Sequence, residues 1–263
     1  MKPRELIGRP IWQGVIGAVI VAVCWEFIPR LFKIPTTIFP PFHAVARSII
    51  ANRYLLWQEL SFTALASVIA WIVAVMLAGG LACTMKLFPA FETVVLYPFL
   101  SIQNIPKVAI APLIVIWLGH GMLPIVALGV LVSFFPILEG YRVGLSLDRT
   151  GIRSIYGPLC KSKWKMLTVI YLPEAMPSIL RGLRVGMSFA TVGVIVGELG
   201  APDRGLGRLI ADGSEIFKYD LQFAAVATVC VMGLLLYGLV VLLEQVPKIA
   251  HYNYSSSSIA IDS

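Results

Sequence analysis

Long apolar segments make up most of this chain, and one long polar interval, residues 140–184, separates its two apolar halves. Several of the segments reach about 20 residues, the length that a helix needs to cross a hydrocarbon core about 30 Å thick. The pattern therefore predicts an all-α, polytopic membrane protein, and it predicts that the polar interval is where the chain meets a partner or a surface in water.

Composition supports this prediction. Charged residues make up only 13% of the chain and hydrophobic residues 58%, with a mean hydropathy of +0.86, whereas soluble domains are about a quarter charged. The chain cannot cover itself with polar surface. Its net charge of +7 is therefore interpreted as setting orientation and meeting anionic lipid, and no nucleic-acid partner is expected.

Cysteine and histidine residues are scattered along the chain. Neither a disulfide framework nor a metal site is expected, because no two cysteines form a CxxC pair and the histidines are isolated in the sequence. We expect a structural or interfacial role for each histidine. The residues concerned are Cys24, Cys83, Cys160, Cys230, His43, His120 and His251.

Six spanning helices in a single membrane domain, residues 1–263, account for the apolar segments. The first run is too long for a signal peptide and lacks a small-residue cleavage site. Pro40-Pro41 breaks any spanning helix in the stretch that follows the first span. After this pair, a short amphipathic helix along the interface is expected within 44–56. The predicted spans are 11–32, 60–83, 90–118, 122–139, 178–199 and 221–243, with a loop at 140–177 and a disordered tail at 251–263.

The third span is irregular, because Pro98, Pro106 and Pro112 interrupt it. Non-helical backbone at membrane depth is tolerated inside protein or beside a water-filled cavity, so a broken helix lining a path is predicted. A proline-kinked helix whose polar groups pair with neighbours is the alternative. The polar residues proposed for the path, here and in the later spans, are Gln103, Asn104, Lys107, Ser133, Ser188, Thr191 and Glu198.

An even number of spans places both termini on one side. Lys and Arg are more abundant on the side of the N-terminus, which is therefore expected to be cytoplasmic. The polar interval is then cytoplasmic as well. Two segments in it, 147–156 and 161–171, can each form a short helix. The second has an apolar face carrying Trp164 and Leu167, which can lie on lipid headgroups or fit a groove on a partner.

The closing half of the interval, Tyr171-Leu172-Pro173 and the residues up to Arg184, resembles the cytoplasmic loop, named after its Glu-Ala-Ala motif, in permease subunits of bacterial ABC importers. Other stretches resemble the nitrate, sulfonate and taurine branch of that family, and their order and spacing extend over residues 34–244. These stretches are Phe39-Pro40-Pro41, 105–113, 134–137, Gly197-Glu198 and Gly205-Leu206-Gly207.

The resemblance implies that the loop forms coupling helices that dock onto an ATP-hydrolysing subunit. Ser154-Ile155-Tyr156 stand where the family motif has Glu-Ala-Ala, and Cys160 stands where it has Gly, so either the docking geometry or the partner's groove is expected to differ. The implied coupling residues are Ser154, Tyr156, Cys160, Lys161, Ser162, Lys163 and Trp164.

The partners implied are two ATPase subunits, an extracytoplasmic solute-binding protein and a second permease copy, in a homodimer or a heterodimer. The chain has no GxxxxGK[ST] run, so ATP and Mg²⁺ are expected on the separate ATPase and no catalytic or metal-binding residue on this chain. The solute is expected to be a small anion (sulfonate, nitrate or bicarbonate) or a small organic molecule. A stand-alone secondary transporter is the alternative.

Overall fold

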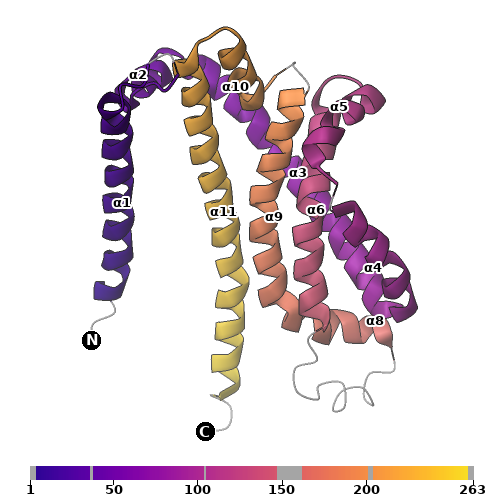
Figure 1. The fold of residues 1–263 in the computed structure, drawn as a ribbon. Coiled ribbons are helices and arrows are strands. Elements are labelled where there is room, and N and C mark those ends of the chain that lie inside the picture. The colour runs from indigo at the N-terminus through magenta and orange to yellow at the C-terminus, as the bar shows by residue number, and fades with distance from the viewer. Residues whose placement is uncertain (1–3, 36–37, 104, 147–161, 201–203, 260–263) are drawn as a thin grey trace.

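The computed structural model describes residues 4–35, 38–103, 105–146, 162–200 and 204–259, and in these ranges it contains helices and connecting turns without a strand, which confirms the all-α class. The elements, drawn in Figure 1, are α1 (Arg4–Leu31), α2 (Phe42–Ala51), α3 (Arg53–Leu87), α4 (Pro89–Gln103), α5 (Lys107–Leu118), α6 (Met122–Ser146), α8 (Lys163–Met166), the π-helical segment η1 (Leu167–Tyr171), α9 (Leu172–Gly200), α10 (Leu206–Glu215) and α11 (Tyr219–Ile259).

Four helical stretches in the part of the chain that was described are long and apolar enough to cross a membrane: Arg53–Leu87, Met122–Ser146, Lys163–Gly200 and Tyr219–Glu244. They contain four of the six predicted spans. The predicted break in the third span is also present, since α4 ends at Gln103 and α5 begins at Lys107, directly after Pro106. The first span, which coincides with α1, and the crossing by α4 and α5 stay predictions.

Several helices continue past the predicted ends of the spans. Helix α6 runs on to Ser146, and α9 begins at Leu172, so the interval 140–177 is largely helical where it is described. Helix α11 extends to Ile259 and includes residues 251–259 of the tail that we expected to be disordered. Adding a residue to an existing helix costs much less than starting one, so a long apolar span extends readily into polar flanking sequence.

Small residues allow the central helices to approach closely. Helix α3 presents a buried stripe with alanine at every fourth position, which packs against α6 and α9. The seam between α6 and α9 is lined by glycines, and a Cβ atom at any of them would lie less than 3.0 Å from an atom of the bundle. The hydrophobic effect does not drive helices together in lipid, so van der Waals contacts at such closely packed seams stabilise their association. The residues are Ala66, Ala70, Ala74, Ala78 and Ala82 on α3, with Gly129, Gly140, Gly144, Gly182, Gly186, Gly193 and Gly197 in the seam.

The two ends of the bundle carry different elements. Helix α8, the start of α1 and the end of α11 lie at one end, which we call the α8 end, and α2 and α10 lie at the opposite end, the α10 end (Figure 1). The described parts of both terminal helices therefore end on the same side as the polar interval.

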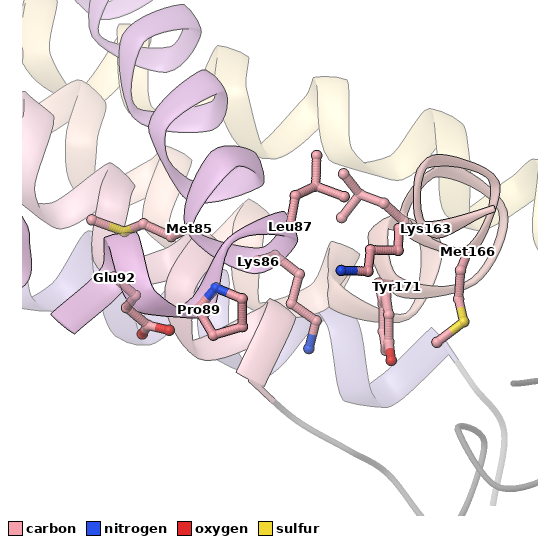
Figure 2. A pocket seen from close by; sticks show the side chains of 9 residues that line it. Met85, Lys86, Leu87, Pro89, Glu92, Lys163, Met166 and Tyr171 are labelled. Carbon is pink, nitrogen blue, oxygen red and sulfur yellow. The ribbon is translucent and has the colours of Figure 1, made fainter.

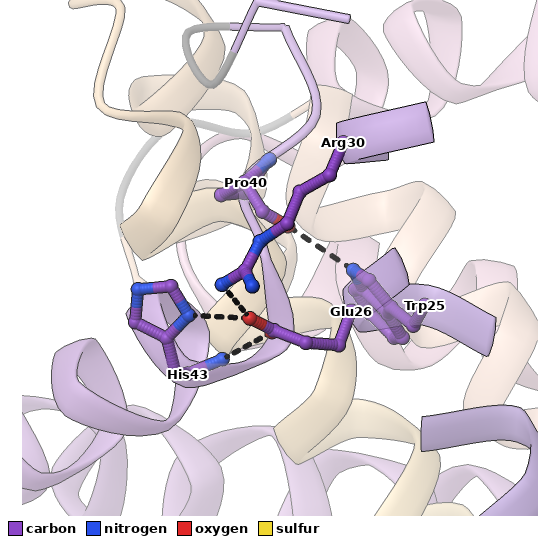
Figure 3. Close-up of polar contacts among 5 residues, drawn as sticks. All are labelled: Trp25, Glu26, Arg30, Pro40 and His43. Carbon is purple, nitrogen blue, oxygen red and sulfur yellow. Dashed lines mark hydrogen bonds and ion pairs between the residues drawn. The ribbon is translucent and has the colours of Figure 1, made fainter. Parts of the chain in front are cut away.

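Helix α1 stands apart from the bundle along most of its length and is docked at the α10 end (Figures 1 and 3). Its Trp25 donates a hydrogen bond from Nε1 to the carbonyl of Pro40 at 3.1 Å. Its Glu26 pairs with Arg30 and lies 2.9 Å from His43 Nδ1, so His43 has the structural role that we expected for it. These contacts fix the C-terminal part of α1 to Pro40 and His43, whereas Ile16, Ile20 and Val21, among its described apolar side chains, are exposed.

Candidate functional site

A groove at the α8 end joins the polar interval to the bundle. It lies between the turn from α3 to α4 and the segment formed by α8 and η1, and its cavity volume is about 280 Å³. Figure 2 shows Lys86 and Pro89 on one side of the groove and Lys163, Met166 and Tyr171 on the other. The complete lining is Met85, Lys86, Leu87, Pro89, Glu92, Lys163, Met166, Leu167 and Tyr171.

Lys86 connects three elements at this groove. Its Nζ donates to the carbonyl oxygen of Leu145 at 2.6 Å and lies 4.1 Å from the centre of the Tyr171 ring. Leu145 belongs to the last turn of α6, where backbone carbonyls have no partner within the helix and attract cations. The ammonium group therefore joins the end of α3 to the end of α6 and to η1.

Leu167 anchors the segment in the bundle. Its side chain is 1% exposed and belongs to a core cluster with Ala82 and Leu138, against which Tyr171 also packs. The apolar face predicted for this segment is thus confirmed at Leu167. Leu167 therefore fixes the segment to α3 and α6 through close packing in the core.

The opposite side of the segment is open. Ser162 and Lys163 are exposed, and the Trp164 side chain is 63% exposed. We expected Trp164 and Leu167 to share one apolar face, but in the structure Leu167 is buried in the core and Trp164 is exposed. The other coupling residues named from the sequence, Ser154, Tyr156, Cys160 and Lys161, lie outside the described residues.

A π-helical segment, η1, joins α8 to α9 without a break, so Lys163–Gly200 is one continuous helical stretch. Such segments occur frequently at functional sites. Pro173 follows at the start of α9 and has no N–H to donate. The irregular backbone therefore lies at the junction between α8 and the spanning helix.

The residues predicted to line a path are not gathered in one place within this chain. Ser133 and Thr191 are buried and donate to carbonyls of their own helices, those of Gly129 at 2.7 Å and Met187 at 3.2 Å. Ser188 is exposed on α9, and Lys107 is half-buried at the first position of α5. Gln103 is the last residue of α4, and Asn104 lies outside the described residues.

Glu198 is fully buried near the α10 end, where its carboxylate accepts hydrogen bonds from Thr63 Oγ1 and from the backbone N–H of Gly207, both at 2.7 Å. Sequence reasoning named Glu198 but missed Thr63, and it used Lys86 only as an orientation marker. The signals were present: Thr63 is a polar residue in an apolar span, and Lys86 is a lone cation at the end of one. In the part of the chain that the structure describes, no group of three or more His, Cys, Asp or Glu side chains could hold a metal ion.

Comparison with known proteins identifies the family. Residues 72–246 match the model of the binding-protein-dependent transport system inner membrane component. The chain is 31% identical over 238 residues to a probable ABC transporter permease of Haemophilus influenzae, covering 90% of this chain and 92% of the relative. It is 28% identical to the formylaminopyrimidine transport permease of Halalkalibacterium halodurans (87% and 91% covered) and 28% identical to the taurine transport system permease of Escherichia coli (90% and 88% covered).

The matched region contains the groove, the segment formed by α8 and η1, and the α6–α9 seam, and its spanning helices agree with a multi-pass protein of the inner membrane. The chain belongs to the family of binding-protein-dependent transport system inner membrane components and is a permease subunit of an ABC importer.

Proposed function

We propose that this permease docks onto its ATPase through the outward face of α8, at the cytoplasmic side of the membrane. One observation carries the proposal: Trp164 is exposed on a short element whose other side is fixed in the core by Leu167. Large exposed aromatic side chains are typical centres of protein interfaces. Lys163 and Ser162 extend this surface, and Ser154, Tyr156, Cys160 and Lys161 precede it in the chain. The N- and C-termini are then cytoplasmic.

ATP binding and hydrolysis belong to separate subunits in this proposal, because the chain has no phosphate-binding GxxxxGK[ST] sequence. Two ATPase subunits hold ATP and Mg²⁺, and their closure moves α8. Leu167 and Lys86 pass that movement to α3 and α6, and η1 passes it to α9. The bundle then alternates between inward-open and outward-open states.

A second permease copy completes the translocation path. Helix α5 presents an uncovered apolar face with Val108, Leu113 and Ile116 exposed, and α9 exposes Val192 and Ser188. A homodimer is the simplest assembly, and a heterodimer is the alternative. The binding protein delivers solute at the α10 end, opposite the ATPase.

The solute is a small anion or a small organic molecule. Relatives are named as permeases for taurine, for aliphatic sulfonates and for formylaminopyrimidine. Lys107, at the break between α4 and α5, supplies a cation suited to an anionic group, and Ser188 supplies a hydroxyl on the uncovered side of α9. Of the residues predicted to line the path, we propose that Lys107 and Ser188 contact the solute.

Replacing Trp164 by alanine is expected to weaken ATPase association about thirtyfold, because truncating an interface tryptophan commonly costs about 2 kcal/mol or more. Co-purification of the ATPase with the tagged permease from detergent measures the effect. Trp57→Ala is the matched control, since Trp57 is 71% exposed at the start of α3, at the α10 end. Equal retention of the ATPase by the wild type and Trp164→Ala would exclude the docking role.

A further inference from the structure

Three side chains from α3 and α9 bind the first N–H groups of α10. The N–H of Gly205 donates to Glu59 Oε2 at 2.6 Å, that of Leu206 to Thr63 Oγ1 at 2.9 Å, and that of Gly207 to Glu198 Oε2 at 2.7 Å. We call Glu59, Thr63 and Glu198 the α10 clamp. Three successive backbone N–H groups thus each donate to a different side chain, and each of these side chains belongs to another helix.

This arrangement solves a general problem of helix termini. The first N–H groups of a helix have no partner within it, and leaving them buried and unpaired costs stability. Gly205, Leu206 and Gly207 are all buried. The buried Glu198 therefore has a complete structural explanation in its contacts with α10.

The two glycines make room for the carboxylate. A Cβ atom at Gly205 would lie 2.1 Å from Glu198 Cδ, and one at Gly207 would lie 2.7 Å from Glu198 Cβ. Gly205 also has φ of +113°, a region that residues with a side chain rarely adopt. Between them, Leu206 is buried in a core cluster with Leu209 and Leu56. The Gly-Leu-Gly sequence thus fits the clamp in both space and backbone conformation.

We propose that Glu198 is a positioning residue, which holds α10 as the cap over α3 and α9 and acts as a hydrogen-bond acceptor rather than as a charge. Both of its oxygens are occupied by Thr63 and Gly207, and its side chain is fully buried within one chain. It is therefore not a solute-binding residue of the path. This role is independent of the identity of the solute and of the ATPase.

The geometry around Thr63 allows a neutral replacement to keep the clamp. Thr63 Oγ1 lies 2.7 Å from Glu198 Oε1 and 3.1 Å from the carbonyl oxygen of Glu59. In Glu198→Gln, the amide oxygen accepts from Gly207 and the amide nitrogen donates to Thr63 Oγ1. The Thr63 hydroxyl then turns its proton to the Glu59 carbonyl and still accepts from Leu206. The donors of Gly207, Leu206 and Thr63 thus each keep an acceptor.

Hydrogen exchange on the full chain in lipid nanodiscs tests the proposal. Backbone amides of residues 204–215 are expected to exchange about tenfold faster or more in Glu198→Ala, because the cap opens locally when its first turn loses acceptors. Glu198→Gln is expected to stay close to the wild type. Thr191→Val is the matched control, since its hydroxyl lies on the same helix and donates to Met187.

Two results would overturn the proposal: exchange in α10 that is unchanged in Glu198→Ala, or exchange that is as fast in Glu198→Gln as in Glu198→Ala, which would show that the charge is required. Gly205→Ala opens the same clamp from the other side, because the added methyl group displaces the carboxylate. It keeps the test decisive if Glu198→Ala fails to insert. Unchanged exchange in Gly205→Ala would contradict the clamp equally.

Discussion

Gly182→Leu is expected to leave less than about a tenth of the wild-type amount of folded, monodisperse protein, because overpacking of a tight contact costs about 1–3 kcal/mol even where neighbours can move. At Gly182 they cannot move separately. A Cβ atom there would lie 2.8 Å from Gly140 Cα and 3.1 Å from the carbonyl oxygen of Pro136, both of which are backbone atoms of α6. A leucine side chain can fit only if α6 and α9 separate, and that separation would disrupt the packing of the whole seam.

Size-exclusion chromatography of the detergent extract measures this effect. Gly233→Leu on α11 is the matched control, because it makes the same change in another spanning helix where a Cβ atom meets nothing within 4 Å. We expect the control to behave like the wild type. Normal yields of folded Gly182→Leu would show that α6 and α9 do not touch through these glycines.

Lys86→Met is expected to release the segment formed by α8 and η1 from the bundle. The substitution keeps an apolar stem but removes a charge-assisted hydrogen bond to Leu145 and the contact with the Tyr171 ring. Together these interactions are worth about 2–4 kcal/mol. Amide exchange in residues 163–171 should rise at least about tenfold, since local opening becomes easier by that free energy, and less ATPase should remain bound.

Lys86→Arg provides the conservative variant, because a guanidinium group can donate to the Leu145 carbonyl and stack on the Tyr171 ring at the same time. Lys165→Met provides the matched control, a loss of charge at an exposed position of the same segment. We expect both to retain slow exchange. If the amides of residues 163–171 exchange equally slowly in Lys86→Met and in Lys165→Met, Lys86 does not hold the segment against the bundle.

The spans and the broken helix could be predicted from the sequence because each depends on local properties. Apolar length marks a spanning helix, and Pro106 marks the start of α5. The close packing of α6 on α9 could not be predicted in the same way. The glycines of the seam are visible in the sequence, but nothing local says that Gly140 meets Gly182 rather than lipid or a second subunit. Alanine at every fourth position of α3 was the readable signal that we did not use.

The site was only partly predictable for a related reason. Glu198 stood out as an acid in an apolar span, and a role beside the solute was a reasonable expectation. Its partner Thr63 lies 135 residues away in the chain, so the clamp exists only after folding. Trp164 and Leu167 were expected on one face of a regular helix. The passage from α8 to π-helical η1 changes the angle between successive residues, and the two side chains point to different surroundings.

Purification of the tagged protein from its native membrane in mild detergent is the most direct test of the importer assignment and of the docking surface at the α8 end. We expect an ATP-hydrolysing subunit to co-purify in equal molar amount with the permease, and its retention to fall in Trp164→Ala and not in Trp57→Ala. Recovery of the folded permease without any ATP-hydrolysing subunit would contradict this expectation and would favour a stand-alone secondary transporter.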